Sequence, residues 1–252
     1  PQMDNDYLGF NSIFNLSPSK IMQISVAHEY FHGIQWGYRK NTSGSKYLYE
    51  MTSMWFEDIL IPDGNDYLDG WVDALLNNPT ADFDNTGGGY ELALFGHYLS
   101  SFVDKKGQTD EKNSSIMLNI WENFKSNSTS PSAFITIQNL LEIQYNISFT
   151  EAWVDFMTRN LYNGIFEDMD NEFYYYIDQT LIDPIETTTP TLYDSFSFEI
   201  DLDDKSVALQ SYSIGDLNTI VEIKHDSDDY VGRVATVSKE SDVNAMFWSK
   251  DT

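Results

Sequence analysis

The chain has 252 residues, of which 41% are hydrophobic and 15% aromatic, so it can bury a sizeable core. It carries 14 Lys and Arg against 40 Asp and Glu, and this net charge of −26 argues against binding to nucleic acid or to anionic membranes. The absence of cysteine excludes disulfides, thiolate metal sites and a cysteine nucleophile, and leaves His, Asp and Glu as the strong metal ligands. No apolar run approaches the roughly 20 residues that span a bilayer, so we expect no membrane insertion.

The first part of the chain predicts a mainly helical structure. Polar and apolar side chains alternate over residues 1–16, which indicates a short strand or hairpin. Ser17 followed by Pro18 is typical of a helix start, and the apolar spacing after it predicts a helix over residues 17–37. Further helical patterns cover residues 46–61, 66–77, 89–104, 114–125, 131–145 and 149–162.

The composition changes near residues 183–192, where Pro and Thr replace the helical pattern. Beyond this point four segments alternate with period two and are separated by Asp, Gly and Asn turns: residues 196–202, 206–213, 218–225 and 230–238. They predict a small antiparallel, sandwich-like β module over residues 186–252, whose sheet we expect to continue beyond the last residue. The expected fold class is therefore α+β, with a helical domain over residues 1–185 and the β module after it.

A His-Glu-Tyr-Phe-His segment lies in the middle of the first predicted helix. His28 and His32 are four residues apart, so they project from one face of the helix and both imidazoles can reach one ion. Glu29 is placed to take a proton from a water at the open position of that ion. Apolar side chains surround the motif on nearly every side, so we expect a buried helix whose ionisable groups are compensated by a metal. The pattern predicts a zinc site with Glu29 as general base.

The third zinc ligand is expected from the second predicted helix. Glu50 lies there among Tyr, Leu, Met and Trp side chains, and Glu57 lies two turns further along the same face. Glu50 is the preferred ligand, and Glu57 is the alternative.

Two segments resemble the metal-binding helices of the gluzincin metallopeptidases: HEYFHGIQWGY at residues 28–38 and YLYEMTSMWFED at residues 47–58. The similarity is to the peptidase MA-like group, distantly related to thermolysin and to zinc aminopeptidases, and it continues to about residue 165. It implies a zincin-like fold, one zinc ion on His28, His32 and Glu50, Glu29 as catalytic base, and hydrolysis of peptide bonds.

One position departs from the thermolysin pattern. Such enzymes carry an Asp four residues after the ligand Glu to orient a zinc-bound His, and here that position is Met54. The outer support of the histidines must come from other side chains. The candidates are Gln35, Ser53, Glu57 and Asp58.

A tetrahedral intermediate also needs an oxyanion stabiliser. Tyr90 follows Gly87-Gly88-Gly89, which predict a flexible loop, and the resemblance implies a Tyr near the start of this helix. His97 lies on the same helix face two turns later and is a second candidate.

The preferred function is an endopeptidase acting on peptides or proteins, secreted or attached to the cell surface. An aminopeptidase is the first alternative, because Met3-Asp4-Asn5 is similar to the strand with which zinc aminopeptidases hold a free amine. A non-catalytic zincin-like scaffold with a ligand-binding β module is the second. Calcium is a further candidate ligand, for the acidic segments 62–73 and 166–173, although neither has EF-hand spacing. The sequence gives no oligomeric state.

Overall fold

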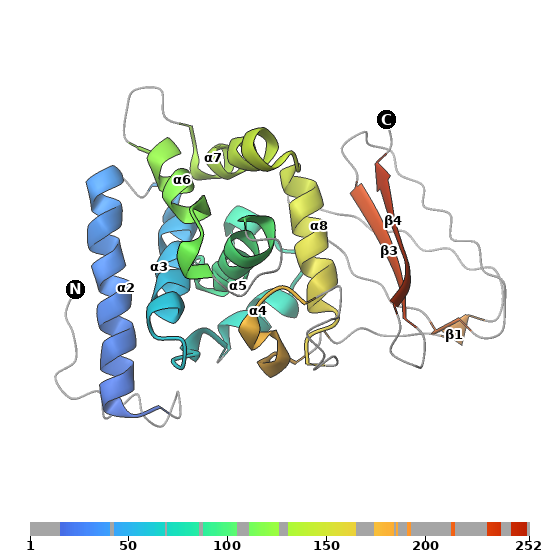
Figure 1. Cartoon of the computed structure of the whole chain (residues 1–252), viewed down its shortest axis with the longest axis horizontal. Coiled ribbons are helices and arrows are strands. Elements are labelled where there is room, and N and C mark those ends of the chain that lie inside the picture. The colour runs from blue at the N-terminus through green and yellow to red at the C-terminus, as the bar shows by residue number, and fades with distance from the viewer. Residues whose placement is uncertain are drawn as a thin grey trace.

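The computed structural model describes residues 16–40, 43–68, 70–85, 88–104, 111–125, 131–164, 174–183 and 185, and four strands beyond them. The α-helices are α2 (Pro18–Tyr38), α3 (Lys46–Leu60), α4 (Trp71–Leu76), α5 (Ala93–His97), α6 (Ile116–Asn123), α7 (Ala133–Leu140) and α8 (Phe149–Asn160) (Figure 1). The 3-10 segments are η1 (Asp66–Leu68), η2 (Phe83–Asn85), η3 (Tyr90–Leu92), η5 (Glu111–Asn113) and η7 (Ile177–Leu181). Two π-helical segments, η4 (Tyr98–Asp104) and η6 (Leu141–Tyr145), extend α5 and α7. This part is helical, as predicted.

The helix ends follow from local side-chain chemistry. Ser17 caps α2 by accepting a hydrogen bond from the backbone N–H of Lys20, as the Ser-Pro start predicts. Ser148 and Glu151 form a reciprocal capping box at the start of α8. The predicted helix 66–77 is instead split into η1 and α4, because Gly70 adopts a left-handed conformation with φ 88° between them.

Four strands lie in the C-terminal part of the chain. β1 (Thr191–Leu192) pairs in parallel with β2 (Ser213–Ile214), and β3 (Val231–Val237) pairs antiparallel with β4 (Val243–Lys250), with a register shift next to Val237. Most of residues 186–252 lie outside the described residues. The antiparallel β module therefore stays a prediction.

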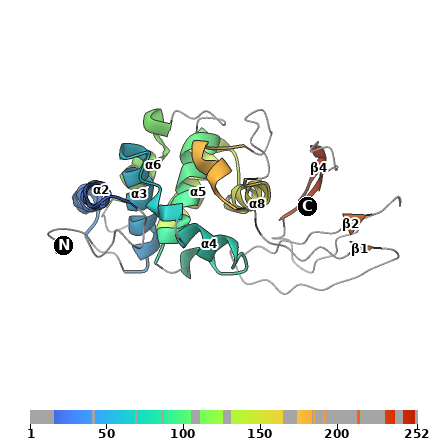
Figure 2. The same ribbon diagram turned by 90° about the horizontal axis from the view of Figure 1, so that it is seen from below.

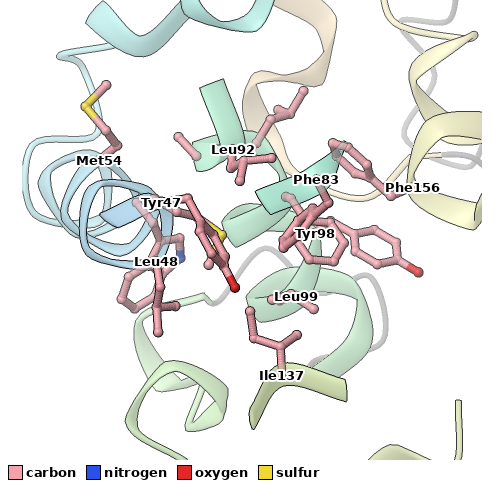
Figure 3. Packing of buried hydrophobic residues seen from close by; sticks show 14 of the residues in the cluster. Tyr47, Leu48, Met54, Phe83, Leu92, Tyr98, Leu99, Ile137 and Phe156 are labelled. Atoms are coloured by element: carbon pink, nitrogen blue, oxygen red, sulfur yellow. The ribbon is translucent and has the colours of Figure 1, made fainter. Parts of the chain in front are cut away.

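The core of the helical part forms around α3 and α5. Every residue of α5 is buried, and from Tyr47 to Asp58 of α3 all residues except Phe56 are buried. Aromatic and aliphatic side chains from the other helices close around this pair (Figure 3). A helix buried on nearly all sides forces its polar residues, among them Glu50, Glu57 and Asp58, to find partners inside the protein.

Helix α2 packs beside α3 at one edge of the helical part, as both views show (Figures 1 and 2). Its face toward α3 is buried and includes Ala27, Phe31 and Gln35, with the Phe31 ring stacked on Phe56 at 4.6 Å. The opposite face exposes Met22, Val26, Tyr30 and Ile34, with fractional exposures of 45%, 47%, 64% and 37%. The expectation of a helix buried on every side was wrong, because within the described residues only one face of α2 has a partner. No helix in the described ranges is long and apolar enough to cross a membrane.

Two glycines bring the segment before Tyr90 close to α3. Gly88 and Gly89 have φ of 106° and 105°, and a Cβ on Gly89 would lie 2.3 Å from the carbonyl oxygen of Tyr47. Only glycine fits such an approach of two backbones. Gly88 and Gly89 are therefore needed for the left-handed backbone before Tyr90, and Gly89 also for the close packing against α3.

The first prediction concerns this approach. Gly89→Ala is expected to lower the free energy of unfolding by about 2 kcal/mol or more, because the new methyl group meets backbone atoms and the φ is unfavourable for alanine. Gly33→Ala is the control: it lies inside α2 with nothing within 4 Å of the new Cβ, and should be neutral or stabilising by up to about 1 kcal/mol. Urea unfolding measures both, and an equal effect of the two substitutions would contradict the packing.

Candidate metal centre

The two histidines of α2 and one carboxylate of α3 converge. Nε2 of His28 and Nε2 of His32 each lie 3.3 Å from Oε2 of Glu50, and the two rings meet edge to face with centroids 4.7 Å apart. Within the described ranges this is the one group of three His, Asp or Glu side chains whose ligand atoms all lie within 4.8 Å of one another. Pairing of α2 with α3 thus brings together the three residues that the sequence predicts as ligands.

Two of the three separations between donor atoms fit a zinc ion. Zinc binds imidazole nitrogen and carboxylate oxygen at about 2.0–2.2 Å, and the corners of a tetrahedron with such bonds are about 3.3–3.6 Å apart. The two separations of 3.3 Å to Glu50 match this edge. Two histidines and one glutamate are also the protein ligand set of a catalytic rather than a structural zinc site, because they leave a fourth position open.

The other ring nitrogen of His28 is held by Glu57. Nδ1 of His28 lies 2.9 Å from Oε2 of Glu57, whose side chain is almost fully buried. Burial lowers the pKa of His28, but hydrogen bonds to Glu50 and Glu57 and their charges outweigh it and raise the pKa to about 10. Glu57 thus contacts Nδ1 of His28, while Glu50 lies at Nε2, the nitrogen that would bind the metal. This geometry is that of a carboxylate that orients a metal-binding histidine.

His32 is oriented by a polar network between the same two helices. Its Nδ1 lies 2.7 Å from Oε1 of Gln35 and 3.1 Å from the hydroxyl of Ser53. The amide nitrogen of Gln35, which is fully buried, donates toward the carbonyl of Tyr49 and the hydroxyls of Thr52 and Ser53. Gln35 and Ser53 were two of the predicted outer supports, and here they leave the Nε2 atom of His32 facing Glu50.

Glu50 is held in its ionised form. Burial raises its pKa, but the hydrogen bonds with His28 and His32 and their charges outweigh burial and lower the pKa to about 2. A carboxylate must be deprotonated to bind a metal, and Glu50 meets this requirement over the physiological pH range. His28, with a pKa of about 10 in the metal-free protein, would have to release a proton when a metal binds.

Tyr90 and Trp71 form an aromatic stack beside the centre. The Tyr90 ring lies parallel to the His28 ring, with centroids 6.0 Å apart, and the Trp71 ring stacks on Tyr90 at 4.9 Å. Burial, and then the charge and hydrogen bond of Glu50, raise the pKa of the Tyr90 hydroxyl to about 12, and the negative charge of half-buried Glu29 adds to this shift. The hydroxyl therefore keeps its proton at neutral pH.

His97 belongs to a different cluster. It is fully buried, its Nδ1 lies 2.8 Å from Oε2 of Glu111, and its Nε2 lies 3.5 Å from Asp58. The Ser100 hydroxyl donates to the same Glu111 oxygen at 2.6 Å and accepts from the indole N–H of Trp55. The structure thus places neither His97 nor Asp58 at the metal centre.

Other sequence expectations have mixed outcomes. Residues 1–15, with Met3-Asp4-Asn5, and the acidic segment 166–173 lie outside the described residues. Within the described part of segment 62–73, the carboxylates form no group of metal-binding geometry. Trp71 was missed, because its place beside Tyr90 depends on the left-handed turns at Gly70 and Gly88-Gly89 and leaves no spacing signal in the sequence.

Comparison of the chain with protein-family models, with curated proteins and with solved structures found no match.

The second prediction separates the two candidate ligands. Glu57→Gln is expected to weaken zinc binding about 10- to 100-fold, as the loss of an outer support does, whereas Glu50→Gln should weaken it more because a direct ligand is lost. Competition with a chromophoric chelator measures both affinities, and far-UV circular dichroism checks folding. The reverse ranking would make Glu57 the ligand.

The third prediction concerns the stability of the metal-free protein. Burial lowers the pKa of His97, but the charge and hydrogen bond of Glu111 and the charge of Asp58 raise it to about 9. This stabilisation is fully present below pH 6.5, the ordinary pKa of histidine, and is lost as the pH rises to about 9. Burial also raises the pKa of Asp58 to about 7, so its ionisation in the folded protein lowers the free energy of unfolding as the pH rises toward 7.

We therefore expect the melting temperature to fall between pH 6.5 and 9, and the NMR resonances of the His97 ring to titrate near pH 9. A melting temperature that rises across this window, or a His97 ring that titrates near 6.5, would contradict the buried ion pair.

Proposed function

We propose that the protein is a zinc-dependent peptidase, with His28, His32 and Glu50 as metal ligands. The observation that carries the proposal is the convergence of three ligand atoms, with both imidazole Nε2 atoms 3.3 Å from one oxygen of Glu50. The support of both Nδ1 atoms by side chains of α2 and α3 favours it further, because a site built for an ion needs its ligands pre-oriented. A bound zinc ion would polarise the scissile carbonyl and lower the pKa of a water in the site to about 7.

Glu29 is proposed as the general base. It follows His28 on the same turn of α2, it is only half-buried, and its charge acts on the Tyr90 hydroxyl at the centre. A carboxylate in this place can take a proton from the attacking water and deliver it to the leaving amine nitrogen.

Tyr90 is proposed to stabilise the oxyanion. A hydroxyl with a pKa of about 12 stays protonated at neutral pH and can donate a hydrogen bond to the developing negative charge. Gly88 and Gly89 hold this residue against α3, so the position of the Tyr90 hydroxyl is already set before substrate binds. His97, predicted as the alternative donor, is fully buried in the separate cluster with Glu111 and Asp58.

The cleavage mode separates the remaining alternatives. Internal cuts of a peptide library would favour the endopeptidase that the sequence indicates, and a ladder of products shortened from the amino end would favour an aminopeptidase. A protein that binds no zinc and cleaves no peptide in excess metal would be the non-catalytic scaffold.

The fourth prediction tests the base. Glu29→Ala is expected to retain one equivalent of zinc while peptide hydrolysis falls about 10²- to 10⁴-fold, because proton transfer is lost and the ligands are not. Glu142→Ala is the matched control, since Glu142 is an exposed helical glutamate that pairs with Gln138, and it should change neither quantity. Full activity of Glu29→Ala would contradict the mechanism, and loss of zinc would make Glu29 part of the metal site.

A further inference from the structure

Trp71 combines solvent exposure with a position beside the metal centre. Its side chain is 37% exposed, although one part of its ring is stacked on Tyr90 at 4.9 Å. Tyr90 in turn lies parallel to His28 at 6.0 Å, so the three rings form one aromatic surface that begins at a metal ligand and ends in solvent. A partly exposed tryptophan in such a place offers a large apolar contact area with little side-chain entropy to lose.

The support of Trp71 is rigid. It begins α4, and the residues that follow it, Val72, Leu75 and Leu76, are 2–3% exposed in the core. The Tyr90 side of the stack is fixed by Gly89, which approaches the backbone of Tyr47 too closely for any other residue. The aromatic surface is therefore preformed.

The charges around this surface select a neutral group. The negative charges of Glu50 and Glu29 act on the Tyr90 hydroxyl, which disfavours an acidic side chain beside it. Lys46, with its ammonium 5.9 Å from the centroid of the same ring, disfavours a second cation. An aromatic or large aliphatic side chain can stack on Trp71 without meeting either charge unfavourably.

Resting on the proposed peptidase function, we infer that Trp71 forms a subsite for an aromatic or large aliphatic side chain of the substrate next to the scissile bond. Burial of such a side chain against the indole makes Trp71 a specificity-determining residue. The chemical step is left to Glu29 and Tyr90.

The first arm of the test is cleavage of a mixed peptide library by the zinc-loaded protein. In the wild-type protein, aromatic and large aliphatic residues should be enriched at one position flanking the cut. Trp71→Ala should reduce that enrichment roughly 5-fold, the effect of losing one aromatic contact, and Trp71→Phe should retain most of it. Leu118→Ala, at an exposed residue of α6, should leave it unchanged.

The second arm needs no catalysis. On titration with N-acetylphenylalanine amide, the indole N–H resonance of Trp71 should shift, and with N-acetylalanine amide it should not. The resonance of Trp36, which is 54% exposed on α2, serves as an internal reference and should not move. The Trp71→Phe spectrum assigns the signal.

The outcomes distinguish the inference from the function on which it rests. If the wild-type protein cleaves peptides and Trp71→Ala keeps the same preference, the subsite is wrong and the peptidase stands. If the wild-type protein cleaves nothing, the peptidase proposal fails, and the indole titration decides the subsite alone. A Trp71 resonance unmoved by the phenylalanine probe overturns the inference.

Discussion

The two histidines of α2 are each held at Nδ1, the ring nitrogen turned away from Glu50, by a side chain that belongs to α3 or is hydrogen-bonded to it. Glu57 holds Nδ1 of His28, and Gln35, tied to Ser53 and Thr52, holds Nδ1 of His32. Because a contact at Nδ1 fixes the orientation of an imidazole ring, it also fixes where Nε2 points, and both Nε2 atoms face Glu50. The convergence of the three ligand atoms is thus a consequence of how one helix pair packs.

That helix pair depends on the core. Helix α3 is buried along almost its whole length, so its polar side chains find their partners inside the protein: Glu50 and Glu57 on α2, Thr52 also at the indole of Trp121, and Asp58 at His97. Contact with the two imidazoles outweighs the cost of burying Glu50 and lowers its pKa to about 2, whereas burial outweighs the contact of Glu57 with His28 and raises the pKa of Glu57 to about 8. The same helix places Asp58 next to His97 of α5. Helix α3 therefore has a buried histidine–carboxylate contact with α2, through Glu57, and another with α5, through Asp58. Helix α3 thus carries both the candidate ligand Glu50 and a carboxylate of the buried His97 cluster.

The helical part of the fold and the candidate metal ligands could be predicted from the sequence. The spacing of His28 and His32 places them on one helix face, and the apolar surroundings of Glu50 indicate a buried carboxylate, because both are properties of local periodicity. The Ser17 cap and the helical character up to Asn160 are local in the same sense. Gln35 and Ser53 could be named as supports only because they lie one turn from the ligands.

The exposed face of α2, the Trp71–Tyr90 stack and the His97 cluster could not be predicted, because they depend on contacts between different segments of the chain. The exposed outer face of α2 could not be foreseen from its composition, since apolar side chains alone do not tell which face has a partner. The Trp71–Tyr90 stack depends on left-handed glycines whose loop geometry fixes the approach, and the pairing of His97 with Glu111 brings together separate segments of the chain. Periodicity carries no information on such pairings.

X-ray absorption spectroscopy of the protein loaded with one equivalent of zinc tests the metal centre most directly. We expect a coordination shell of two imidazole nitrogens at about 2.0–2.1 Å and carboxylate and water oxygens at about 2.0–2.2 Å. The imidazole scattering should be lost when both His28 and His32 are replaced by alanine. A shell of oxygen ligands alone, or one that survives this double replacement, would contradict the proposed metal centre.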